Sequence, residues 1–177
     1  MLELRRVPID HPDARQLING LFAFYGEVYG GEGDATPVDV AEFSPPRGAF
    51  YVGYLDGEPV ACGGWRARDH DPADPQVRDG DAEIKRMYVA PGHRGRGFAR
   101  AVLTALEESA AAAGRTRAIL ETGSPQTAAI RLYEAAGYTR IPGFGRYRRS
   151  PLSRCFAKLL VGARTSVSAE VPRSGAG

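Results

Sequence analysis

The chain has 177 residues, a length that suits one domain with a hydrophobic core large enough to fold alone. The charges of its 23 basic and 21 acidic residues nearly cancel, which argues against electrostatic binding to nucleic acid or to a membrane. No stretch approaches the roughly 20 apolar residues of a membrane span, and the first residues lack the apolar core of a signal peptide. Cys62 and Cys155 lie in apolar runs, which is typical of buried, reduced thiols. We therefore expect a cytoplasmic protein with a single domain over 1–161.

The periodicity of apolar residues, together with glycine and proline positions, predicts alternating helices and strands. The segment from 162 to 177 has small and polar residues without aromatics, so we expect a flexible C-terminal tail there. The predicted elements in chain order are a helix over 13–29, strands over 49–55 and 59–67 joined by a hairpin turn at 56–57, a solvated loop over 68–80, a strand over 83–89, a helix over 98–113, a short strand over 118–121, a helix capped at 124–125 that ends near 136, and a strand pair over 138–141 and 152–160.

A glycine-containing turn, Arg94-Gly95-Arg96-Gly97-Phe98-Ala99, joins a predicted strand to a predicted helix. Glycines let the backbone approach a ligand closely, and the first amides of a helix have no partners within the helix. Such a turn is suited to an anion, usually a phosphate. It lacks the Gly-Lys-Ser/Thr ending of a Walker loop and the third small residue of a dinucleotide fingerprint.

The turn satisfies the signature (Gln/Arg)-x-x-Gly-x-(Gly/Ala), and two other blocks lie at matching distances from it. The chain in this respect resembles the GNAT superfamily of N-acetyltransferases, whose loop of this kind holds the pyrophosphate of acetyl-CoA. The strand over 83–89 resembles the fourth strand of that family. A second motif is matched downstream, with Gln126 in place of Asn and Tyr138 in place of Phe; its residues are Gln126, Ala129, Leu132, Tyr133, Gly137 and Tyr138.

This resemblance implies an α+β fold with α/β/α layers, in which helices flank a mixed, mostly antiparallel central sheet that is splayed between its fourth and fifth strands. It also implies acetyl-CoA as co-substrate. The expected cofactor-binding residues are the strand residues Met87, Tyr88 and Val89, the turn residues Arg94, Gly95, Arg96, Gly97, Phe98, Ala99 and Arg100, and Gln126. We expect no metal, and we interpret the acidic residues of 68–80 as a solvated loop.

Acetyl transfer requires a proton donor for the departing thiolate and a base for the substrate ammonium. The resemblance places Tyr133 at the position of the acid, although a tyrosine that only packs beside Leu132 is the alternative. Glu83, at the start of the fourth strand, ranks first as base. Glu121, at the end of the fifth, is either a base or a substrate-binding residue. Solvated carboxylates at strand ends are the simpler interpretation of both.

In this fold the acceptor pocket is lined by the N-terminal helices and by the loop between the last two strands. We expect Tyr25, Tyr29, Arg146 and Tyr147 to contact the substrate there. Aromatic and arginine side chains suit a small amine, either amino-acid-like or antibiotic-like. A protein lysine or N-terminal acceptor, or a non-catalytic module that senses acyl-CoA, remains open. Many members of the superfamily are homodimers, so that assembly is also possible.

Overall fold

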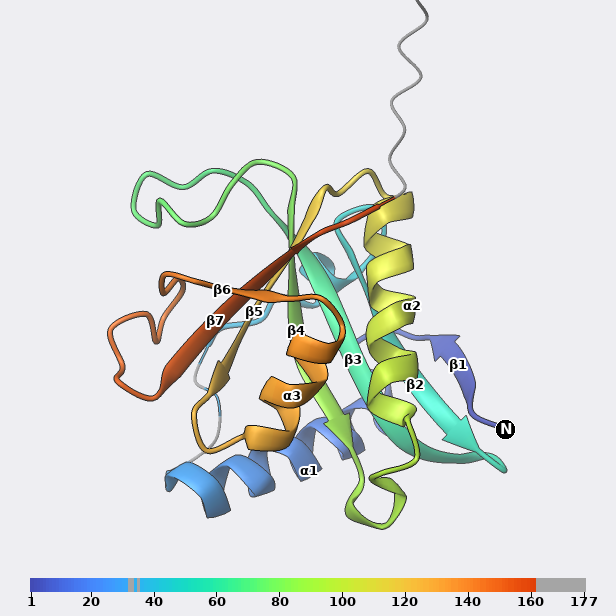
Figure 1. The fold of residues 1–177 in the computed structure, drawn as a ribbon. Coiled ribbons are helices and arrows are strands. Elements are labelled where there is room, and N and C mark those ends of the chain that lie inside the picture. The colour runs from blue at the N-terminus through green and yellow to red at the C-terminus, as the bar shows by residue number, and fades with distance from the viewer. Residues whose placement is uncertain (32–33, 35, 162–177) are drawn as a thin grey trace, which may run out of the picture.

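We describe a computed structural model over residues 1–31, 34 and 36–161, and the predicted C-terminal tail lies outside this range (Figure 1). Within this range, no helix combines the length and apolarity needed to cross a bilayer. The elements are β1 (Glu3–Arg6), α1 (Pro12–Tyr29), η1 (Val40–Phe43), β2 (Gly48–Leu55), β3 (Glu58–Arg68), β4 (Asp81–Val89), η2 (Pro91–His93), α2 (Phe98–Ala112), β5 (Arg117–Gly123), α3 (Thr127–Ala135), β6 (Thr139–Ile141) and β7 (Ser153–Leu159).

In the described part of the chain, seven strands form one sheet in the order β1-β2-β3-β4-β5-β7-β6. Neighbouring strands are antiparallel except β4 and β5, which run parallel. The β4–β5 pairing ends at Glu83 and Ile119, beyond which the two strands diverge, as Figure 1 shows. This confirms the predicted α+β fold with its mixed, splayed sheet.

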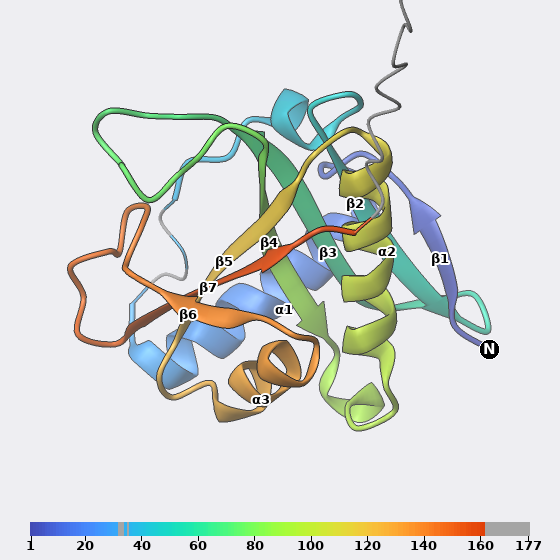
Figure 2. The same ribbon diagram turned by 45° about the horizontal axis from the view of Figure 1, so that its top comes forward.

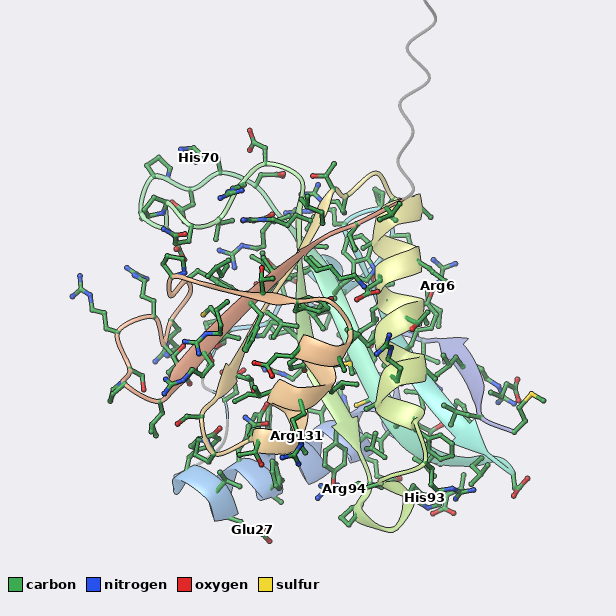
Figure 3. All side chains as sticks on the ribbon, in the orientation of Figure 1. Arg6, Glu27, His70, His93, Arg94 and Arg131 are labelled. Atoms are coloured by element: carbon green, nitrogen blue, oxygen red, sulfur yellow. The ribbon has the colours of Figure 1, made fainter. Side chains whose placement is uncertain are left out.

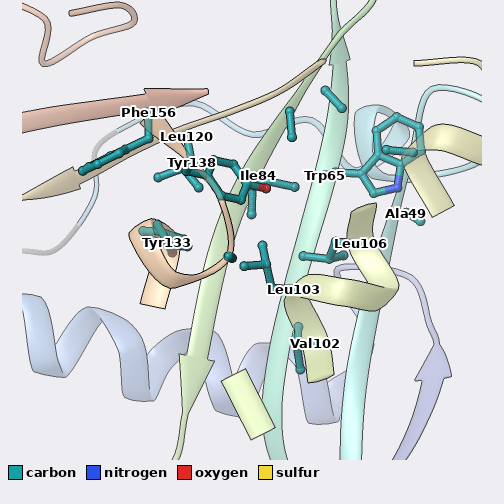
Figure 4. Packing of buried hydrophobic residues seen from close by; sticks show 14 of the residues in the cluster. Ala49, Trp65, Ile84, Val102, Leu103, Leu106, Leu120, Tyr133, Tyr138 and Phe156 are labelled. Carbon is teal, nitrogen blue, oxygen red and sulfur yellow. The ribbon is translucent and has the colours of Figure 1, made fainter. Parts of the chain in front are cut away.

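Helices cover both faces of the sheet (Figure 2). On one face, α1 contributes Ala14 and Leu17 to a core cluster with Phe50 of β2. The opposite face carries α2 and α3, whose Leu103 and Tyr133 belong to the cluster shown in Figure 4. The period of about 3.6 residues in the helices and of two in the strands explains why each element presents one apolar side to its neighbour.

Three local predictions were wrong or incomplete. The segment 69–80 is not merely solvated, since Asp74 and Val77 are buried, and Asp81 begins β4 two residues earlier than expected. The third helix is not capped by Ser124-Pro125: it begins at Thr127, with Gln126 at the N-cap position and no capping side chain. Strand β1 was not predicted, because four residues with only one inward side chain leave little periodic signal.

Candidate active site

A cavity of about 1000 Å³ lies where β4 and β5 diverge. A volume of this order is at the upper end for small-molecule sites, typically about 300–1,000 Å³. The sheet, α1, α3, the glycine turn and the loops over 69–80 and 142–152 all contribute to its lining. Every site residue predicted from the sequence lines this cavity except Arg96. The lining residues that were predicted are Tyr25, Tyr29, Glu83, Met87, Tyr88, Val89, Arg94, Gly95, Gly97, Phe98, Ala99, Arg100, Glu121, Gln126, Tyr133, Arg146 and Tyr147.

The glycine turn has the conformation that its sequence predicts. Gly95 and Gly97 have φ angles of 73° and 80°, in the left-handed region that favours glycine, and Gly97 is the N-cap of α2. Nothing lies within 4 Å of the point where a Cβ would stand on either residue, so the backbone faces open space. The free amides at the start of α2 therefore line a concave surface suited to a pyrophosphate.

The arginines of this turn differ in their contacts. The Nε of Arg94 donates to the Val89 carbonyl at 3.0 Å, and its guanidinium lies 5.2 Å from the centre of the Phe24 ring. Arg94 thus joins the turn to β4 and α1, and Figure 3 shows it beside His93 below α2. The Arg96 guanidinium lies over the Phe98 ring at 4.9 Å, outside the cavity. Arg94 is the better placed of the two for a phosphate contact.

The second half of β4 carries a backbone irregularity next to the cavity. Arg86 has a φ of 60°, and the β3–β4 register shifts between Cys62 and Gly64. A Cβ on Gly63 would lie 2.8 Å from the Met87 Sδ and 2.9 Å from the Val102 Cγ1, so glycine fits the close packing opposite the shift. Since the β4–β5 pairing has ended by this point, the backbone around Met87 is available to a ligand in the cavity.

Tyr133 reaches the cavity from α3, on the α2 side of the sheet. Its ring packs against Tyr138 and Phe156, with centroid distances of 5.8 and 6.3 Å (Figure 4). Burial raises the pKa of the phenol to about 12. The side chain is therefore both a packing residue and a hydroxyl that stays protonated at neutral pH.

Glu121 lies on the other face of the sheet. It pairs in register with Cys155 of β7, and burial raises the pKa of its carboxyl to about 7, while the Ser153 hydroxyl and the Lys85 ammonium partly oppose this rise. A carboxyl with a pKa near 7 exchanges protons readily at neutral pH, which is the property of a general base.

Glu83 is held by cations. Its Oε2 accepts hydrogen bonds from Arg66 Nε and Arg68 Nη1, both at 2.8 Å. The positive charges of Lys85, Arg66 and Arg68 outweigh the opposing effect of burial and lower the pKa of Glu83. Its environment is therefore that of a structural carboxylate, and it is a poorer proton acceptor than Glu121.

Tyr29 and Gln126, predicted to contact different ligands, are bonded to each other. The Gln126 amide donates to the Tyr29 hydroxyl at 2.8 Å. A Cβ on Gly123 would lie 1.9 Å from the same hydroxyl, so only glycine leaves room for this contact. The end of α1 is thereby held against β5 and α3, and the Tyr25 ring lies 6.0 Å from that of Tyr29.

Sequence reasoning missed several residues that line the cavity, among them Asp34, Arg68, Asp74 and Lys85. Asp34 pairs with Arg86 and lies 3.4 Å from the Lys85 Nζ, and these positive charges lower its pKa. Asp74 accepts from the Gly145 amide at 2.6 Å and so joins the two acceptor-side loops. Only Lys85 had a sequence signal, since it follows Glu83 by two residues and so shares its strand face.

The model of the acetyltransferase (GNAT) family matches residues 15–138, about the whole of the fold from α1 to α3. The chain belongs to this family. Membership makes the protein an acyltransferase with acetyl-CoA as co-substrate, as the sequence predicted. The open glycine turn fits that molecule, because its anionic pyrophosphate requires free amides without side-chain obstruction.

Several relatives and solved structures are similar to the chain. IAA acetyltransferase of Azospirillum brasilense is 33% identical over 145 residues, which is 82% of this chain and 89% of that protein. Human N-acetylaspartate synthetase is 28% identical over 64% of this chain, but the match spans only 35% of that protein. A Klebsiella pneumoniae crystal structure has 28% identity and a TM-score of 0.72, covering 90% of this chain and 98% of that one. YncA of Salmonella typhimurium, solved with its cofactor acetyl-CoA, has a TM-score of 0.64 at 16% identity and covers 90% and 94%.

Proposed function

We propose that this protein transfers the acetyl group of acetyl-CoA to a primary amine of a small molecule by direct attack in a ternary complex. The observation that carries this proposal is the cavity between β4 and β5, which Glu121 lines from one face of the sheet and Tyr133 from the other. A proton acceptor and a proton donor on opposite sides of one cavity suit a reaction in which an amine enters and a thiol leaves.

In this mechanism Glu121 accepts a proton from the acceptor ammonium, whose ordinary pKa is about 10. The neutral amine then forms a C–N bond with the acetyl carbon, and the C–S bond breaks. Tyr133 supplies a proton to the sulfur and regains one from the new ammonium nitrogen. The proton held by Glu121 passes to solvent, so the net reaction releases one proton.

A backbone amide of Met87, Tyr88 or Val89 is the proposed donor to the oxyanion. This part of β4 lies beyond the last pair with β5, so its backbone is not committed to the sheet on that side. In other enzymes, removing one such donor costs about 3–4 kcal/mol of transition-state stabilisation. The glycine turn and Arg94 would hold the pyrophosphate, and Gln126 supports the site through Tyr29.

We infer a small acceptor from the two loops that line the acceptor side of the cavity. The loops over 69–80 and 142–152 both line it and are joined by the Asp74 contact, an arrangement that suits a small molecule better than a folded protein. The name of one relative, N-acetylaspartate synthetase, also refers to an acetylated small molecule. Residues Tyr25, Arg146 and Tyr147 line this side and are proposed to contact the acceptor. A cytoplasmic location and a homodimer remain predictions from the sequence.

The test is a panel of small amines with acetyl-CoA, in which released thiol is measured and the acetylated amine is identified by mass. We expect release that depends on the amine. Tight acetyl-CoA binding without release for any amine would contradict the proposal and favour a sensor of acyl-CoA. Release only with peptides would favour a protein acceptor.

A further inference from the structure

A row of charged side chains runs across β3, β4 and β5 on the face covered by α1. Asp81 pairs in register with Arg117, and Glu83 pairs with Ile119. Continuing this parallel register by two residues places Lys85 opposite Glu121, on the same face and just past the last backbone pair. Both side chains line the cavity, where the positive charge of Lys85 opposes the burial that raises the pKa of Glu121.

Lys85 is the cation of this row whose carboxylate partners lie farthest from it. Its Nζ lies 3.4 Å from Asp34 Oδ2 and 3.7 Å from Glu83 Oε1. Both distances exceed the roughly 2.7–2.9 Å of a charge-assisted hydrogen bond. The two carboxylates also bind arginines at shorter range, Asp34 through Arg86 and Glu83 through Arg66. A three-donor ammonium held only at this distance retains donors for a ligand.

The salt bridges of the network join four cations to three carboxylates, and Glu121, when deprotonated, supplies the fourth negative charge. The three carboxylates are Asp34, Glu42 and Glu83, and the cations are Arg66, Arg68, Lys85 and Arg86. The Lys85 side chain is only 12% exposed, so solvent compensates its charge poorly. When the acceptor ammonium binds Glu121, an anionic group on the same acceptor would offset the Lys85 charge.

We propose that the acceptor is an amine that carries a carboxylate, with the carboxylate bound by Lys85 and the amine directed to Glu121. This inference rests on the proposed function and specifies its substrate class. Neighbouring strands in a sheet lie about 4.8 Å apart, and the splay widens this spacing only progressively, so a molecule with few bonds between its two groups spans the pair. Amino acids have this form. Polyamines and polycationic antibiotics do not, because they bring positive charge to Lys85.

The test compares standard L-amino acids with their carboxamides as acceptors, using the ratio of kcat/KM for each acid and amide pair. Wild-type protein is expected to prefer the acid by about 10-fold or more, since hydrogen bonds to charged groups have this magnitude. Lys85→Met should abolish the preference, and Lys85→Arg should largely restore it. Lys158→Met is the matched control, because Lys158 pairs with Glu107 at 2.9 Å outside the cavity and its loss should leave the ratio unchanged.

Comparing the ratio between variants removes the effect of amine basicity, which is the same for every variant. Equal use of acid and amide by the wild-type protein would overturn the carboxylate assignment while leaving acetyl transfer intact. If Lys85→Met keeps the preference for the acid over the amide, another residue binds the carboxylate and the assignment to Lys85 fails. A stronger preference for phosphorylated amines than for amino acids would overturn the carboxylate in favour of a phosphate.

A second measurement separates failure of this inference from failure of the proposed function. The melting temperature of the protein saturated with CoA should rise with at least one of the standard L-amino acids but not with its carboxamide, because a ligand stabilises only the state that binds it. Lys85→Met should not show this difference. If no amine is acetylated but the difference is present, the carboxylate site stands and the transferase proposal fails.

Discussion

The Nε of Arg66 donates a hydrogen bond to the Glu83 carboxylate at 2.8 Å, between neighbouring strands of the sheet. Arg68 donates to the same oxygen, and Arg66 reaches Glu42 of η1 at 2.9 Å through its Nη1. The carboxylate that ranked first as base from the sequence thus joins β3 to β4 and lies within a set of ion pairs. This relationship gives the two glutamates of the cavity different expected roles.

Replacement Glu83→Gln is expected to lower the free energy of unfolding. Removing one partner of a buried ion pair costs up to about 3–5 kcal/mol, and the Arg66–Glu42 pair that remains lowers this cost. Denaturant unfolding monitored by circular dichroism measures the change. The folded pKa of Glu83 is lowered, so its contribution to stability is present at neutral pH and is lost as pH falls below its ordinary value of 4.5. If Glu83→Gln unfolds with the wild-type free energy but its turnover no longer rises with pH, Glu83 is the base instead.

Replacement Tyr133→Phe is expected to lower kcat by about 10²–10⁴-fold, the usual contribution of a positioned proton donor. The ring contacts with Tyr138 and Phe156 remain, so the melting temperature should change little. The KM for acetyl-CoA should also be preserved. Turnover that equals the wild-type value at every pH would eliminate Tyr133 as the acid.

Replacement Gly97→Ala is expected to weaken acetyl-CoA binding. Gly97 has a φ of 80°, and a left-handed conformation costs an L-residue about 1–2 kcal/mol. The turn would shift to relieve this strain, so the Kd from calorimetric titration should rise. Gly92→Ala is the matched control in the neighbouring turn, because Gly92 has open space around its Cβ position and no positive φ. Equal affinity of the two variants would argue against the pyrophosphate site.

Replacement Glu121→Gln is expected to stabilise the protein above pH 7. The folded pKa of about 7 exceeds the ordinary 4.5, so the folded state binds the proton more tightly and wild-type stability declines as pH rises from about 4.5 to 7. The variant lacks this titration. The melting temperature of Glu121→Gln should therefore exceed that of the wild-type protein at pH 8 but not at pH 5. A constant difference across the range would mean that the carboxyl pKa is not raised.

Sequence reasoning succeeded where chemistry depends on neighbours along the chain. The turn from Arg94 to Ala99 combines a strand end, glycines and a helix start, and these local features fix its conformation without distant contacts. The motif around Tyr133 places that residue on one helix face in the same way. The resemblance then supplied the splay and the co-substrate.

Sequence reasoning failed where partners are far apart. The parallel register of β4 and β5 pairs Glu83 with Ile119 and brings Lys85 and Glu121 to one cavity, and no local pattern encodes that alignment. The Asp74 carboxylate meets the Gly145 amide across 71 residues, which is why an apparently solvated loop contains a buried acid. Tyr29 meets Gln126 across 97 residues. Such contacts follow only from the folded topology.

The most direct test of the central claim is the pH dependence of kcat, measured with saturating acetyl-CoA and an accepted amine for wild-type protein and Glu121→Gln. The wild-type kcat should rise with pH through an apparent pKa of about 7, because only the deprotonated carboxylate accepts the substrate proton. The variant should lose that step and fall by about 10²–10⁴-fold at pH 8. A variant that keeps both the step and the wild-type rate would contradict Glu121 as the base.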